Sequence, residues 1–174
     1  MGYPIFTGIF LDEESKDAVK QLFKTLSYLH IKEYDHFYCR HVTLNRRPDF
    51  KELLFSESEP AVECYLTHLV QDPYIQTFKV FVPFPHKKKH THLTYAIADD
   101  EEHSRYGGNK RPIAKPFYSN HLLKHLKNVE QGRRDRNPEV IELTLSEPFL
   151  ITGNIVTIMS NSSYRPHGTA SRYT

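Results

Sequence analysis

The sequence predicts a mixed α+β fold in which helices pack on a β-sheet. Runs of β-branched and aromatic residues indicate strands, and apolar residues at helical spacing indicate helices, in the order strand, helix, strand, helix, strand, strand, helix, strand, strand. The 174 residues, 39% hydrophobic and 25% charged, are enough for one well-cored globular domain and few for two. We therefore expect one catalytic domain over residues 1–160 and a polar tail over residues 161–174.

The N-terminal region predicts a strand followed by a helix. Residues 3–11 (YPIFTGIFL) are typical of a strand. Asp12 is the expected N-cap of a helix over residues 15–29, because acidic residues follow it and suit the positive end of a helix. The apolar positions of this helix are Ala18, Val19, Leu22, Phe23, Leu26 and Leu29.

Residues 37–44 (FYCRHVTL) indicate a second strand, which the Arg-Arg-Pro sequence over residues 46–48 ends. Side chains alternate between the two faces of a strand. One face is then expected to carry Cys39, His41 and Thr43. The opposite face is expected to carry Tyr38, Arg40, Val42 and Leu44.

The middle of the chain is less uniform. Residues 50–70 are ambiguous, because their second half has apolar residues at helical spacing while Pro60 favours a break before it. Two further strands are indicated by residues 75–84 (IQTFKVFVPF) and 91–98 (THLTYAIA). Residues 99–116, which follow the second of them, are expected to form a mobile loop.

The C-terminal part predicts a helix and a strand pair. Ser119 is a candidate cap for a helix to about residue 128. Residues 140–145 and 149–160 indicate two strands around a turn at residues 146–148.

Composition narrows the classes of protein. No apolar run approaches the ~20 residues of a membrane helix, and the two cysteines do not form a metal-ligand pair. The net charge is only +2, but basic residues gather in residues 86–90, 110–115 and 133–136. We expect an intracellular protein, cytoplasmic or nuclear, with no membrane partner, whose basic runs either contact polyphosphate or are solvated loops.

Two His-x-Thr-x motifs carry the expected chemistry: residues 41–44 (HVTL) and 92–95 (HLTY). In a strand each motif displays an imidazole and a hydroxyl on one face. A single such motif among 11 histidines is uninformative, whereas two copies in strands indicate a shared site. Two imidazoles can serve as acid and base in attack on a phosphodiester, and threonine hydroxyls can donate to its non-bridging oxygens, without a metal or other cofactor.

The paired motifs resemble those of the 2H phosphoesterase superfamily. That resemblance implies a two-lobed, pseudo-twofold fold with antiparallel sheets and helices outside, in which the motifs face each other across a central groove. More narrowly, HLTYAIA followed by KRPIAKPFYSNHLL (residues 110–123) resembles the cyclic phosphodiesterase domain of fungal tRNA ligases. The implied reaction opens RNA 2′,3′-cyclic phosphate ends to a 2′-phosphate and a 3′-hydroxyl, in tRNA splicing or RNA repair.

The resemblance also implies roles for residues. His41 and His92 would be the catalytic pair, His41 as acid and His92 as base, with Thr43 and Thr94 holding the phosphate; the residues alone leave the order of acid and base open. We expect Tyr95, Lys115 and Tyr118 to contact the substrate, Tyr95 either by stacking on a base or by packing in the core. The expected partner is an RNA, such as a tRNA exon, and the chain is expected to be monomeric or a domain of a larger RNA ligase.

Four alternatives remain at this stage. His90 and His92 are spaced as strand-borne metal ligands and could hold zinc with His41. Cys39 is either a nucleophile or a small buried thiol. The protein could also be a non-catalytic module that binds RNA ends, or a phosphodiesterase of small cyclic nucleotides.

Overall fold

The computed structural model describes residues 2–26, 29–58 and 61–161 as a mixed α+β fold, which confirms the predicted class. The elements are β1 (Pro4–Leu11), α1 (Glu13–Leu26), β2 (His36–Phe37), β3 (His41–Arg46), α2 (Phe50–Ser58), β4 (Ala61–Gln71), β5 (Ile75–Phe81), β6 (His92–Ile97), α3 (Glu101–Arg105), α4 (Tyr118–Glu130) and β7 (Ile141–Met159). None of the helices in this described part has the length and apolar character needed to cross a bilayer.

The strands form one antiparallel sheet that closes on itself. Their order is β2-β6-β3-β1-β7-β4-β5, and β5 also pairs with β6, so six strands close into a barrel. The short strand β2 pairs with the end of β6, on the edge that β3 also pairs with. The link between β3 and β6 is the thinnest, with the single pair Val42–Leu93. The sequence did not predict this closure into one continuous sheet.

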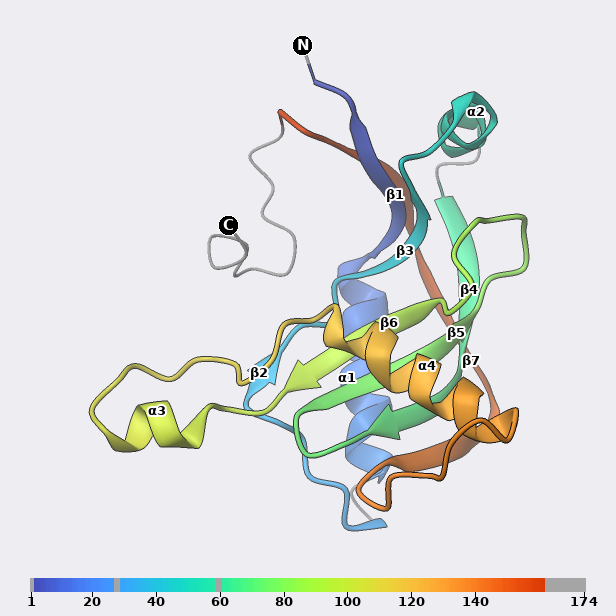
Figure 1. The fold of residues 1–174 in the computed structure, drawn as a ribbon. Helices are drawn as coiled ribbons and strands as arrows, with labels where there is room; N and C mark the ends of the chain where they lie inside the picture. The colour runs from blue at the N-terminus through green and yellow to red at the C-terminus, as the bar shows by residue number, and fades with distance from the viewer. Residues whose placement is uncertain (1, 27–28, 59–60, 162–174) are drawn as a thin grey trace.

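Two helices cover opposite sides of this sheet, with α4 crossing in front of β5 and β6 and α1 behind them (Figure 1). Phe23 of α1 stacks on Tyr95 of β6 with ring centroids 4.4 Å apart, inside the main core. The α4 residues Leu122, Leu123 and Leu126 pack on a second cluster around Ile75 of β5. The two helices therefore pack on different hydrophobic clusters.

Asp12 caps the first helix as predicted, but the helix begins at Glu13 rather than at residue 15 and also ends earlier than predicted. The Asp12 carboxylate accepts from the Ser15 backbone N–H at 2.7 Å, so Asp12 is the N-cap. The helix ends at Leu26 rather than at residue 29, and residues 27–28 lie outside the described residues.

The second predicted strand is interrupted, and the prediction of one strand over residues 37–44 is wrong. Cys39 has φ +52°, a left-handed conformation that breaks the alternation between β2 and β3. The thiol therefore turns into the core instead of sharing the face of His41. After the break the prediction is correct: Val42 and Leu44 are buried, and His41 and Thr43 lie on the other face, partly exposed.

The structure resolves the ambiguity over residues 50–70 into the helix α2 and the strand β4, and it contradicts the turn predicted at residues 146–148. The helical spacing of residues 61–69 belongs to a strand, β4, whose pairing with both β5 and β7 overrides local periodicity. The turn at residues 146–148 lies inside the single long strand β7. Leu66 pairs with Phe149 and His68 with Thr144, so these residues form a bulge opposite β4 rather than a chain reversal.

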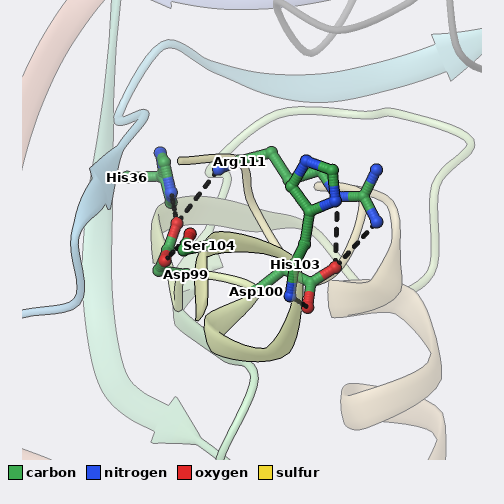
Figure 2. A network of polar contacts seen from close by, with 6 residues as sticks. All are labelled: His36, Asp99, Asp100, His103, Ser104 and Arg111. Carbon is green, nitrogen blue, oxygen red and sulfur yellow. Dashed lines mark hydrogen bonds and ion pairs between the residues drawn. The ribbon is translucent and has the colours of Figure 1, made fainter. Parts of the chain in front are cut away.

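The segment over residues 99–116, predicted as a mobile loop, is tied down by acidic residues (Figure 2). Asp99 accepts from Ser104 Oγ at 2.8 Å and from the Arg111 N–H at 3.0 Å, and lies 2.8 Å from His36 Nε2. These bonds, chiefly that from His36, hold the pKa of Asp99 below its usual value. Asp100 caps α3 and pairs with Arg111 at 3.0 Å.

The later helix is confirmed as α4, but its cap is not the predicted one. The cap position is Phe117, and the buried Ser119 places its Oγ 2.8 Å from Thr94 Oγ1 instead. Of the predicted tail, residues 162–174 lie outside the described residues.

Candidate active site

The two His-x-Thr motifs lie on the neighbouring strands β3 and β6. Val42 and Leu93, the middle residues, pair directly and are fully buried. In an antiparallel pair the residues on either side of such a pair point to the opposite face. His41, Thr43, His92 and Thr94 therefore share one face of the sheet, each partly exposed.

This face carries a narrow cavity lined by all four motif residues. Its volume of about 30 Å³ gives room for roughly two waters. A small anionic group fits such a space, whereas a whole nucleotide would extend out of it. The remaining lining residues are Tyr38, Arg40, Arg46, Lys88, Pro116, Phe117 and Asn120.

Aromatic packing positions His41. Its ring stacks on Phe10, with centroids 4.9 Å apart, and on Phe6 at 5.3 Å. Both rings come from β1, which approaches β3 closely at Gly8. A Cβ at Gly8 would lie 3.0 Å from the Val42 carbonyl oxygen, so the missing side chain permits this approach.

A hydrogen bond within its own strand region positions His92. Nδ1 lies 2.9 Å from the His90 carbonyl oxygen. A carbonyl oxygen only accepts, so Nδ1 carries the hydrogen of this bond. Nε2 is therefore the nitrogen of His92 that gains or releases a proton.

The two threonines differ in their surroundings. Thr94 Oγ1 donates to the Pro116 carbonyl at 3.2 Å and lies 2.8 Å from Ser119 Oγ. Its single hydroxyl hydrogen is thus engaged by the protein, and donation to a phosphate requires this bond to be exchanged. Thr43 has no side-chain hydrogen bond to the described residues, so its hydroxyl can donate directly to a ligand.

Three cationic side chains complete the cavity: Arg40, Arg46 and Lys88. Lys88 donates to Asn120 Oδ1 at 2.7 Å, and burial, with Arg46 nearby, lowers the pKa of its ammonium. Sequence reasoning placed Lys88 in a basic run and missed both arginines. Arg40 was assigned to the face opposite His41, and the left-handed turn at Cys39 is what brings it to the same cavity.

The residues expected to contact substrate lie elsewhere. Tyr95 is fully buried, stacked on Phe23, with its hydroxyl donating to Glu33 at 2.9 Å, which corrects its assignment as a substrate contact. Lys115 and Tyr118 line a separate cavity of about 330 Å³ that meets the central one at Phe117. The Tyr118 hydroxyl donates to Asp72 at 2.8 Å, and burial raises its pKa to about 12.

The geometry does not favour the zinc and thiol alternatives. His90 lines a different cavity from His41 and His92, and within the described ranges no three His, Cys, Asp or Glu side chains are placed to hold a metal ion. Burial raises the pKa of the Cys39 thiol to about 12, so at neutral pH it is not a thiolate nucleophile.

Comparisons with known proteins identify a fold and no family. No family profile and no curated protein matches the sequence. Among solved structures the chain is similar to one described as "Crystal Structure of Fungal RNA Kinase", with a TM-score of 0.55 and 13% identity. The match covers 88% of this chain and 45% of that one, so the chain spans less than half of the fungal protein. At this identity the likeness concerns the fold alone.

Proposed function

We propose that the protein hydrolyses 2′,3′-cyclic phosphate ends of RNA to a 2′-phosphate and a 3′-hydroxyl, without a metal, in RNA repair or tRNA splicing. The observation that supports this best is the meeting of both His-x-Thr motifs in one narrow cavity with three cationic side chains. The similarity of the fold to part of a fungal RNA kinase structure is consistent with a role at RNA ends. We also propose that the chain belongs to the 2H phosphoesterase superfamily, with its two-lobed fold, and that it is a domain of a larger RNA ligase.

In the proposed reaction a water oxygen attacks phosphorus while the bond from phosphorus to the 3′ oxygen breaks. His92 Nε2 takes the proton from water, and protonated His41 gives a proton to the leaving 3′ oxygen. Each turnover leaves His92 protonated and His41 neutral, and exchange with solvent restores both. This order of acid and base follows the family resemblance.

The remaining cavity residues would stabilise charge on the phosphoryl group. Arg40, Arg46 and Lys88 supply positive charge, and Arg side chains suit the geometry of phosphate oxygens. The Thr43 hydroxyl is the more accessible of the two donors, because that of Thr94 is engaged by Pro116. Donors aimed at developing charge are typically worth 10²–10³-fold each.

The test is hydrolysis of an oligonucleotide ending in a 2′,3′-cyclic phosphate, with and without EDTA, followed by identification of the product. We expect a 2′-phosphate product, full activity in EDTA, and none in the double variant His41→Ala/His92→Ala. His30→Asn is the matched histidine control, because His30 lies in a turn at φ +61° that Asn tolerates. Binding of the RNA without turnover by the wild-type protein would instead identify a non-catalytic module.

A further inference from the structure

A second, larger cavity lies beside the central one and has a strongly basic wall. Its volume is about 790 Å³, and it is bounded by α4, β5 and the chain just before β6. The only acidic residue in its lining is Glu130. The cationic lining residues are Lys79, Lys89, Lys124, Lys127 and Arg133.

Most of this positive charge is not neutralised within the described part of the chain. Lys79 pairs with Glu142, and Lys127 lies 3.9 Å from Glu130 in a solvent-exposed pair one helical turn apart. Lys89, Lys124 and Arg133 form no ion pair with a described acidic side chain. Like charges gathered in one hollow repel each other, and an anionic ligand would relieve that repulsion.

The field of these lysines is felt by His90, which also lines the cavity. Burial and then the positive charges of Lys88, Lys127, Lys89 and Lys79 lower the pKa of its imidazole. Burial and then Lys79 also lower the pKa of His68, the other histidine of the lining. The positive charge of the cavity wall therefore comes from its lysines and arginine rather than from its two histidines.

An exposed aromatic ring accompanies the charge. Phe81 at the end of β5 lines the cavity, and 58% of its surface is exposed. Basic grooves with exposed aromatic rings are typical of proteins that bind single-stranded nucleic acid, because the cations follow the backbone and the rings stack on bases. This combination favours RNA over an acidic peptide.

The same two segments of the chain, the one before β6 and the helix α4, line both cavities. Lys88 lines the central cavity while Lys89 lines the basic one, and the His90 carbonyl accepts from His92. Along α4, Asn120 borders the first cavity and Lys124 and Lys127 the second. Asn120 to Lys127 spans about 10 Å of helix axis, which is roughly the rise of three stacked nucleotides.

We propose that the basic cavity holds the backbone phosphates of the nucleotides next to an RNA end whose terminal phosphate occupies the central cavity. The substrate is then an oligonucleotide rather than a small cyclic nucleotide. This inference rests on the proposed function and deepens it. It assigns the path of the RNA strand across the protein, here called the strand path, to α4 and β5 rather than to the loop that carries Lys110. In that loop, Arg111 is paired with Asp100.

The experiment compares a 2′,3′-cyclic mononucleotide with a hexanucleotide that carries the same terminal group. In Lys124→Ala/Lys127→Ala we expect kcat/KM for the hexanucleotide to fall about tenfold, with the mononucleotide unchanged. The dependence of log kcat/KM on log salt should become less steep by about 1.4 for the hexanucleotide, the value for two lost single-strand contacts. Lys32→Ala/Lys51→Ala makes the same change in net charge elsewhere and should change neither substrate.

Binding of a fluorescent hexanucleotide with a 2′-phosphate end separates the two proposals. If the wild-type protein hydrolyses neither substrate but binds the hexanucleotide in a manner that needs Lys124 and Lys127, the strand path holds and the proposed reaction fails. If hydrolysis occurs but the variant treats the hexanucleotide as the wild type does, the strand path is wrong.

Discussion

The two His-x-Thr motifs look equivalent in the sequence but are held in different ways. His41 is positioned by packing, between β3 and two phenylalanine rings of β1. His92 is positioned by a hydrogen bond to the His90 carbonyl, and Thr94 by contacts to Pro116 and Ser119. The contacts that hold the first motif thus include two aromatic rings, and those that hold the second include hydrogen bonds to two backbone carbonyls.

The largest expected effect comes from removing either imidazole. His41→Ala and His92→Ala should each lower kcat about 10²–10⁴-fold, with circular dichroism unchanged. The pH profile of the residual activity assigns the roles. Loss of the acidic limb in His92→Ala and of the alkaline limb in His41→Ala is expected if His92 is the base, and the reverse pattern would exchange the two roles.

The threonines sharpen the comparison in a second way. Thr43→Val should lower kcat by about 10²-fold, the effect of one lost donor to developing charge, with little change in Tm. Thr94→Val should also destabilise the fold by about 1 kcal/mol, because it leaves buried Ser119 without a partner at that position. Thermal melts of both variants beside the kinetics distinguish them, and equal melting temperatures would contradict the difference.

Gly8→Ala tests the packing that holds the first motif. The new Cβ would press on the Val42 carbonyl at 3.0 Å and lie 3.6 Å from His41 Cδ2, so β3 must move by a few tenths of an ångström. Small displacements of catalytic groups are costly, and we expect a loss of about tenfold in kcat at most. Unchanged kcat in folded protein would show that His41 tolerates the displacement.

Ser119→Ala tests the support of the second motif and should have the smallest effect. It removes the hydroxyl beside Thr94 without removing Thr94 itself. We expect kcat to change by less than about fivefold and stability to fall by about 1 kcal/mol, the value of one hydrogen bond. A larger loss of activity in Ser119→Ala than in Thr94→Val would contradict the claim that Ser119 acts only by supporting Thr94.

The strands that carry the motifs could be predicted because their alternation is local. Val42 and Leu93 are apolar residues between polar ones, and this pattern alone places His41 and His92 on a common type of face. The meeting of the two strands was expected from the duplication of the motif and from the family resemblance. No local pattern encodes a pairing between residues so far apart in the chain.

The errors share a physical cause, which is that non-local contacts overrode local signals. The left-handed conformation of Cys39 places Arg40 on the face of the catalytic candidates instead of the opposite face, and a cysteine does not indicate such a conformation. Pairing across β4 kept the predicted turn at Pro148 inside β7. Tyr95 is different, because it follows the local alternation of β6 into the core, which was one of its two expected placements.

The most direct test of the shared site is a crystal structure with a nucleoside 2′-phosphate bound. We expect one phosphate with a nitrogen of His41 and Nε2 of His92 both within hydrogen-bond distance, and with Arg40, Arg46 or Lys88 on its oxygens. A phosphate that contacts only one histidine, or that binds away from both, would contradict the claim that the two motifs act on the same phosphoryl group.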